Sequence, residues 1–259
     1  MGEAMLAALL DKGLSSPQDI SVSDISKTRR QYLQQKYGVT VIADNRQDLK
    51  NAAVIVLAIK PQNLAQVVAE LRGQLKPAQL VLSIIAGATL KTLCQRLKHN
   101  RVVRAMPNTP AQIGEGLTVW TATKEVIPRQ RKWTASILGA MGKEIHAEDE
   151  KYIDMATAIS GSGPAYFFLF VEALVEAAVS IGFSREMARV LVLETMLGAG
   201  HLIQKSGQEP AELRHMVTSP GGTTAEAMLE FEKGKFSDLV KKAISAAYRK
   251  ARILGGEQP

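Results

Sequence analysis

The sequence predicts a mixed α/β domain followed by an all-helical domain. In the first half, short β-branched runs alternate with helical runs, which is the β-α-β-α rhythm of a doubly wound parallel sheet. The strand runs lack polar and apolar alternation, as is typical of strands buried on both faces. After Tyr152 the strand signal disappears. We therefore expect a Rossmann-like domain over residues 1–150 and a helical domain over residues 151–259.

The elements of the first domain follow from its apolar runs and from the Gly and Pro residues that separate them. A helix is expected first, at Gly2–Lys12. Strands are expected at Ile20–Ser23, Val39–Ile42, Ala53–Ala58, Leu80–Ile85 and Arg101–Met106. Helices are expected at Lys27–Tyr37, Asn63–Leu75 and Leu90–Lys98, and added strands at Leu117–Thr121 and Glu144–Ala147 flank a helix at Pro128–Met141.

The opening helix is unexpected, because a doubly wound sheet begins with the strand that lies at its centre. We expect that first strand, and most of the glycine-rich loop that follows it, to be missing from this sequence. Gly2 is the one residue that matches the last glycine of such a loop.

The second domain consists of helical runs only. They are expected at Ala156–Ile181, Ser184–Lys205, Pro210–Met216, Thr223–Glu232 and Ser237–Leu254. Two of them are apolar around most of their circumference, at Tyr166–Ala178 and Ala188–Leu197, and such helices are buried. A domain of about 100 residues can rarely bury so much apolar surface alone. This favours a dimer with intertwined helices over a compact monomeric bundle.

Composition excludes several classes of protein. The single cysteine, Cys94, rules out an intrachain disulfide and a cysteine-based zinc cluster, and the four histidines show no paired spacing, so we expect no metal site. The most apolar stretch, Pro164–Phe183, contains Glu172 and Glu176, so no membrane span is expected. The net charge of +7 is spread along the chain, which argues against nucleic acid as a partner. We expect a cytoplasmic protein.

Candidate cofactor contacts lie after strands, where ligands bind in open α/β sheets. They are Ser23, Asn45, Lys60 and Ala86, and simple turn chemistry is the alternative for each. About 20 residues after Gly2, Asp24 would favour NAD. Ser23 with the basic residues Lys27, Arg29 and Arg30 would favour the additional phosphate of NADP. The charge pattern leans toward NADP, and ordinary surface charges remain the alternative.

Thr218–Thr224 is the strongest local motif. Its two glycines precede a helix whose first N–H groups would face a ligand, which suits a carboxylate. An elaborate N-cap is the alternative, but the run Ser-Pro-Gly-Gly-Thr-Thr is longer than a cap requires. Two further loops, Arg104–Pro110 and Ser160–Ala165, admit both a structural and a ligand-binding interpretation.

In this order the motifs resemble the pyrroline-5-carboxylate reductase family. The matching stretches cover Val56–Gln62, Ile84–Gly87, Arg101–Pro110, Gly114–Gly116, Thr157–Tyr166 and Pro210–Thr224. The resemblance implies NADPH, or NADH, as the hydride donor and 1-pyrroline-5-carboxylate as the substrate, in the last step of proline biosynthesis. It also implies a homodimer or a ring of dimers.

The resemblance also assigns residues. Those expected to line the cofactor site are Gly2, Ser23, Asn45, Ile59, Lys60 and Ala86. Those expected to hold the substrate are Ser219, Gly221, Gly222, Thr223 and Thr224. Thr224 is the expected catalytic residue, because its hydroxyl can hydrogen-bond the ring nitrogen of the substrate.

Two alternatives stay open at this stage. A β-hydroxyacid dehydrogenase shares the layout, but its family uses a lysine in the long helix, and no lysine lies between Lys151 and Lys205. The second is a dimeric binding or scaffold protein that has lost its cofactor together with the phosphate loop.

Overall fold

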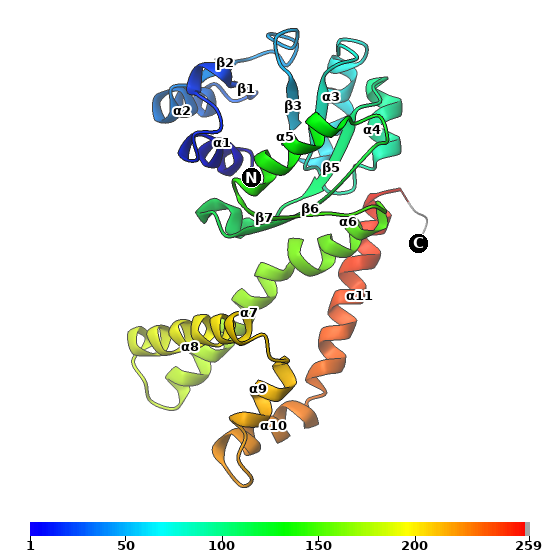
Figure 1. Cartoon of the computed structure of the whole chain (residues 1–259). Coiled ribbons are helices and arrows are strands. Elements are labelled where there is room, and N and C mark those ends of the chain that lie inside the picture. The colour runs from blue at the N-terminus through cyan, green and yellow to red at the C-terminus, as the bar shows by residue number, and fades with distance from the viewer. Residues whose placement is uncertain (257–259) are drawn as a thin grey trace. The chain divides into compact units, whose positions relative to one another are not determined.

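A computed structural model describes residues 1–256 (Figure 1). The chain forms two compact units. The first contains Met1–Pro164 together with the residues from Ala246 onward, and the second contains Ala165–Ser245. The predicted order, an α/β half followed by helices only, is confirmed.

The strands of the first unit form two sheets. Their bounds are β1 Ser21–Ser23, β2 Thr40–Ile42, β3 Val54–Leu57, β4 Leu80–Ser83, β5 Val102–Met106, β6 Gly116–Ala122 and β7 Gly142–His146. β1 pairs with β2 in parallel, and the other sheet has the order β3-β4-β5-β6-β7, with only the β5–β6 pair antiparallel. The two sheets share no hydrogen-bonded strand pair.

Helices cover both faces of the larger sheet (Figure 1). Those of the first unit are α1 Gly2–Asp11, α2 Lys27–Tyr37, α3 Leu64–Leu71, α4 Leu90–Leu97, α5 Pro128–Gly139 and α6 Lys151–Ala156. α3 is shorter than predicted. It follows a 3₁₀ turn at Pro61–Asn63, and it ends at Leu71 because Arg72 leaves the helical conformation and Gly73 has φ +73°.

β4 lies in the middle of the core, and all four of its residues are buried. Leu80 and Leu82 pack in one cluster with α1 and α5, whereas Val81 packs in a second cluster with α3 and α4. Burial on both faces explains why the strand sequence shows no alternation.

α1 contributes to two different cores. Met5 is 3% exposed and packs against β4 of the larger sheet. The next residue, Leu6, packs against Leu33 of α2 and Val39, beside the smaller sheet. The opening helix therefore joins the two sheets, which are not hydrogen-bonded to each other.

The predicted long helix after Ala156 is interrupted. α6 continues into a π-helix at Thr157–Gly161, and α7 follows at Gly163–Ser180. The remaining helices are α8 Arg185–Ser206, α9 Pro210–Met216, α10 Thr223–Lys233 and α11 Phe236–Leu254. Among the described residues, Lys151–Ser180 is the one helical stretch whose length and hydropathy would allow a membrane crossing, a test that core helices of soluble proteins also pass.

Candidate functional site

The predicted cofactor residues all belong to the first unit, and most follow the carboxyl ends of parallel strands. Ser23 is the last residue of β1, and Asn45 follows β2. Lys60 follows β3 and Ala86 follows β4. Ligands of open α/β sheets bind beyond such strand ends, and the assignment of these four residues to a cofactor site stays a prediction.

The N-terminus of α1 lies beside the end of β3. The helix begins at Gly2, and no side chain caps its N-terminus. A Cβ atom placed on Gly2 would lie 3.1 Å from Cβ of Ala58, so the helix backbone runs close to the end of β3. Uncapped amides at a helix start with little room for a side chain would suit the phosphates of a dinucleotide.

The sequence suggested that Arg29 could bind a phosphate near the end of β1. In the structure Arg29 is instead paired with a carboxylate. Its guanidinium pairs with Glu3 of α1, which also accepts hydrogen bonds from Tyr32, Lys36 and Tyr37. Although burial opposes ionisation, the hydrogen bonds from Tyr37, Arg29, Lys36 and Tyr32 lower the pKa of Glu3 to about 2. This cluster could not be predicted from the sequence, because its members lie 26 or more positions from Glu3.

The loop after β1 is held by its own charged residues. Asp24 accepts a hydrogen bond from the backbone N–H of Ser26 at 2.8 Å. Arg30 donates to the carbonyl oxygens of Asp24 at 2.5 Å and Ile25 at 3.1 Å. The carboxylate that would favour NAD therefore already has a structural hydrogen bond, while Arg30 folds over the backbone next to Ser23.

Asn45 also has a partner that sequence reasoning missed. Its side-chain amide donates to Glu70 of α3 at 2.6 Å. Gln66 donates to the other oxygen of the same carboxylate at 3.0 Å. These bonds fix the orientation of the Asn45 amide after β2, as a ligand-contacting amide requires.

The predicted substrate residues lie together in the second unit, in the turn after α9 and at the start of α10. Gly221 has φ +68°, and a Cβ atom on Gly222 would lie 2.5 Å from Oγ of Ser219. The left-handed φ favours glycine at position 221, and a side chain at position 222 would require the Ser219 hydroxyl to move. Gly222 is the N-cap of α10, and no side chain caps the helix. The amides of Thr223 and Thr224 remain available to a carboxylate.

The loop after β5 is held by structural hydrogen bonds. The side-chain oxygen of Asn108 accepts from the backbone N–H of Leu117 at 2.8 Å, which favours the structural interpretation of that loop. Ser160 and Ser162 donate to carbonyl oxygens of the preceding turn. A Cβ atom on Gly161 would lie 3.0 Å from Cε of Met106, so the π-helix packs closely on the end of β5.

A buried ion pair network joins β5 to α6 and to the residue before it. Arg104 of β5 has a side chain only 2% exposed, and it pairs with Glu150 at 2.9 Å and Asp154 at 2.6 Å. Glu150 also accepts the backbone N–H of Leu90 at 2.8 Å, at the start of α4. The sequence analysis missed this network; an arginine within the apolar run Val102–Met106 is the one signal that could have indicated it.

Comparisons with known proteins cover nearly the whole chain. Residues 150–254 match the family described as "Pyrroline-5-carboxylate reductase dimerisation". Residues 1–87 match "NADP oxidoreductase coenzyme F420-dependent". Pyrroline-5-carboxylate reductase from Synechocystis is 40% identical over 255 residues, 98% of this chain and 95% of that protein. The chain belongs to the pyrroline-5-carboxylate reductase family.

Solved structures of reductases agree with this assignment. The reductase from Coxiella burnetii is 37% identical, with a TM-score of 0.88 over 98% of this chain and 94% of that chain. The reductase from Plasmodium falciparum, solved with NADP bound, is 31% identical, with a TM-score of 0.90 over the same shares of the two chains. The family resemblance predicted from the motifs is confirmed.

Other oxidoreductases share the fold alone. A semialdehyde dehydrogenase NAD-binding protein from Cupriavidus necator is 14% identical, with a TM-score of 0.59 over 96% of this chain and 95% of that chain. At that identity the likeness carries no inference about activity.

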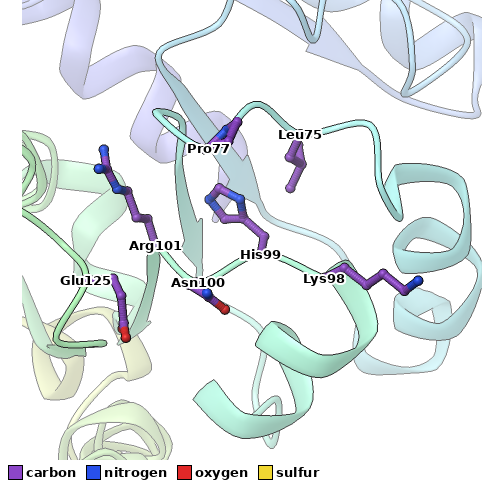
Figure 2. Close-up of a pocket in the computed structure, with 7 residues that line it drawn as sticks. All are labelled: Leu75, Pro77, Lys98, His99, Asn100, Arg101 and Glu125. Atoms are coloured by element: carbon purple, nitrogen blue, oxygen red, sulfur yellow. The ribbon is translucent and has the colours of Figure 1, made fainter.

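A depression at the opposite edge of the sheet is not part of the candidate site. Its volume is about 480 Å³, and its residues precede β4 or β5 or lie near them: Leu75, Pro77, Lys98, His99, Asn100, Arg101 and Glu125 (Figure 2). The imidazole of His99 points toward Pro77 and hydrogen-bonds the carbonyl oxygen of Gln79 at 2.8 Å. Among residues 1–256, no group of side chains suited to hold a metal ion is present.

Proposed function

We propose that this chain reduces 1-pyrroline-5-carboxylate to L-proline with a nicotinamide cofactor, the reaction for which its relatives are named. The observation that carries the proposal is near-complete alignment at 40% identity with one such reductase. The turn from Ser219 to Thr224 supports it, because its uncapped helix N-terminus suits the carboxylate that this substrate carries.

The reaction requires no covalent bond between the protein and the substrate. A bound nicotinamide supplies a hydride to the imine carbon, and one proton reaches the ring nitrogen, so that the C=N bond becomes the C–N bond of proline while NAD(P)H becomes NAD(P)⁺. The amides of Thr223 and Thr224 would hold the carboxylate of the substrate and so fix the orientation of its ring.

Thr224 is the proposed catalytic residue. It lies in the first turn of α10, two residues after the N-cap Gly222. From there its hydroxyl can hydrogen-bond the ring nitrogen while the amides hold the carboxylate of the same molecule. A hydroxyl both donates and accepts, so it can hold the proton at nitrogen as the imine becomes an amine.

Thr224→Ala tests this assignment. We expect kcat to fall by about 10²-fold, at the lower end of what positioned proton transfer contributes, with an unchanged Tm. Thr224→Ser keeps the hydroxyl and should recover most of the rate. Thr195→Ala is the matched control, because the Thr195 hydroxyl bonds only its own helix, at Leu191 O. Full turnover by Thr224→Ala would remove this residue from the mechanism.

We propose NADPH as the preferred cofactor. Lys27, Arg29 and Arg30 lie within eight positions of Ser23. Arg29 pairs with Glu3 and Arg30 donates to the carbonyl oxygens of Asp24 and Ile25, so a bound phosphate would compete with these contacts. The one carboxylate of that loop, Asp24, accepts the backbone N–H of Ser26. A phosphate prefers such a positively charged loop that also offers a hydroxyl.

The ratio of kcat/KM for NADPH to that for NADH tests the preference. In the double variant Arg29→Gln/Arg30→Gln, we expect kcat/KM for NADPH to fall about tenfold or more, as the loss of one charge-assisted contact would cause, and that for NADH to change little. Arg46→Gln removes an exposed arginine after β2 that pairs with Asp44, and it is the control. Equal loss for both cofactors would contradict the proposal.

We propose that the second unit forms a homodimer. Phe167, Phe168 and Leu169 of α7 are 64–67% exposed, and the matched family over residues 150–254 is named for dimerisation. In this proposal a partner subunit, rather than lipid, covers the apolar face of α7. We also propose that the enzyme is cytoplasmic. Light scattering after gel filtration, without detergent, should give the mass of a dimer or of a ring of dimers; a monomer would contradict this assembly.

A further inference from the structure

The turn after β4 is in close contact with the C-terminal end of α11, within the first unit. Gly87 has φ +76°, and a Cβ atom there would lie 2.6 Å from the carbonyl oxygen of Leu254 and 2.7 Å from its Cβ. Such distances are shorter than any real Cβ contact, so the backbone of Leu254 occupies the space beside Gly87. We call this approach the C-terminal contact.

The residues after Gly87 also have structural contacts. A Cβ atom on Gly255 would lie 3.5 Å from Cγ2 of Thr89, an ordinary van der Waals distance, and Ala251 of α11 is 4% exposed. Ala88 is 1% exposed, and its backbone N–H donates to the carbonyl oxygen of Ile85 at 3.3 Å. Glu150 accepts the N–H of Leu90. These contacts restrict the segment from Ala88 to Leu90.

This turn occupies a functional position. It follows the carboxyl end of β4, where cofactors of open α/β sheets bind, and Ala86 is a proposed cofactor contact. We propose that Gly87 and Leu254 are positioning residues: the C-terminal contact holds the turn where the cofactor requires it and thereby sets cofactor affinity. This inference rests on the proposed nicotinamide-dependent function.

Gly87→Ala and Gly73→Ala form a matched pair. Gly73 has φ +73°, almost the value of Gly87, but nothing lies within 4 Å of a Cβ atom there. The two variants therefore share the strain of a left-handed alanine, and only Gly87→Ala displaces the C-terminal contact. We expect the Kd of NADPH, measured by fluorescence titration, to rise about tenfold in Gly87→Ala and to stay near the wild-type value in Gly73→Ala.

A truncated chain that ends at Ile253 separates an indirect effect from direct collision with the cofactor. It removes the carbonyl of Leu254 that a Cβ atom at residue 87 would strike. We expect truncation alone to raise the Kd of NADPH, and Gly87→Ala to add little in the truncated chain. If the two effects multiply, the alanine acts on the cofactor directly and the inference is wrong.

The rate at saturating cofactor is the second readout. A change in cofactor positioning at the turn should raise KM for NADPH while leaving kcat within about twofold of wild type, whereas general destabilisation would lower Tm without this split. If the wild-type protein itself binds no NADPH, the proposed function fails. If the wild type binds NADPH and Gly87→Ala behaves like Gly73→Ala, only the C-terminal contact is refuted.

Discussion

Arg104 offers the sharpest test of the energetics of the first unit. Its side chain is 2% exposed and pairs with two carboxylates, Glu150 and Asp154. Replacement by methionine keeps much of the volume but leaves both carboxylates without their cation. Breaking a buried ion pair by removing one partner costs about 3–5 kcal/mol.

This loss of folding stability should be visible as a lower Tm. For a chain of this size each kcal/mol corresponds to about 2–4 °C, so Arg104→Met should lower Tm by about 6–20 °C. Both tryptophans, Trp120 and Trp133, lie in the first unit, so tryptophan fluorescence follows that unit. The protomer concentration must be held constant, because oligomerisation shifts apparent stability.

Two further variants sharpen the result. Arg46→Met breaks an exposed pair with Asp44 and should cost no more than about 1 kcal/mol. The triple variant Arg104→Met/Glu150→Gln/Asp154→Asn removes the uncompensated charges together and should recover part of the loss. A single Arg104→Met variant as stable as Arg46→Met would refute the reasoning, since the network would then contribute no more than a surface pair.

Three other variants test the same unit. Because the folded-state pKa of Glu3 lies at about 2, below its ordinary value of 4.5, wild type should lose stability as the pH falls between these values, and Glu3→Gln should show a flatter profile of urea midpoint against pH. Burial lowers the pKa of His99, so stability should decline as the pH falls below about 6.5, the unfolded value, and His99→Gln should remove this decline. A Cβ atom on Gly142 would lie 2.1 Å from the carbonyl oxygen of Gly116; Gly142→Ala should therefore lower Tm far more than Gly114→Ala, where nothing lies within 4 Å.

Helix boundaries could be predicted where the stop and start signals are local. The predicted bounds Lys27–Tyr37 are those of α2, because Ser26 caps its N-terminus and Gly38 takes a left-handed conformation after it. α3 ends earlier than predicted, because Arg72 turns the chain before the apolar pattern ends. The sequence marks a capping residue, but it does not mark the point at which packing turns the backbone.

Charged partners could not be predicted, because they depend on which elements the fold brings together. Glu3 meets Tyr37 only because α1 packs beside α2, 34 positions away in the chain. Arg104 meets Glu150 because α6 packs near the end of β5. A pattern of residue types carries no information on such a partner.

Glycines too are constrained either by neighbours in the sequence or by distant segments of the chain. The difference determines how a glycine variant should be interpreted. Gly221 and Gly222 could be predicted as a turn, because the requirement for glycine comes from neighbours in the sequence such as Ser219. The requirement at Gly87 comes from Leu254, near the other end of the chain. Substitution in the first kind of turn disturbs a binding motif and should change turnover of the substrate. Substitution in the second kind disturbs the contact that places a motif, so its effect should disappear when the distant partner is removed.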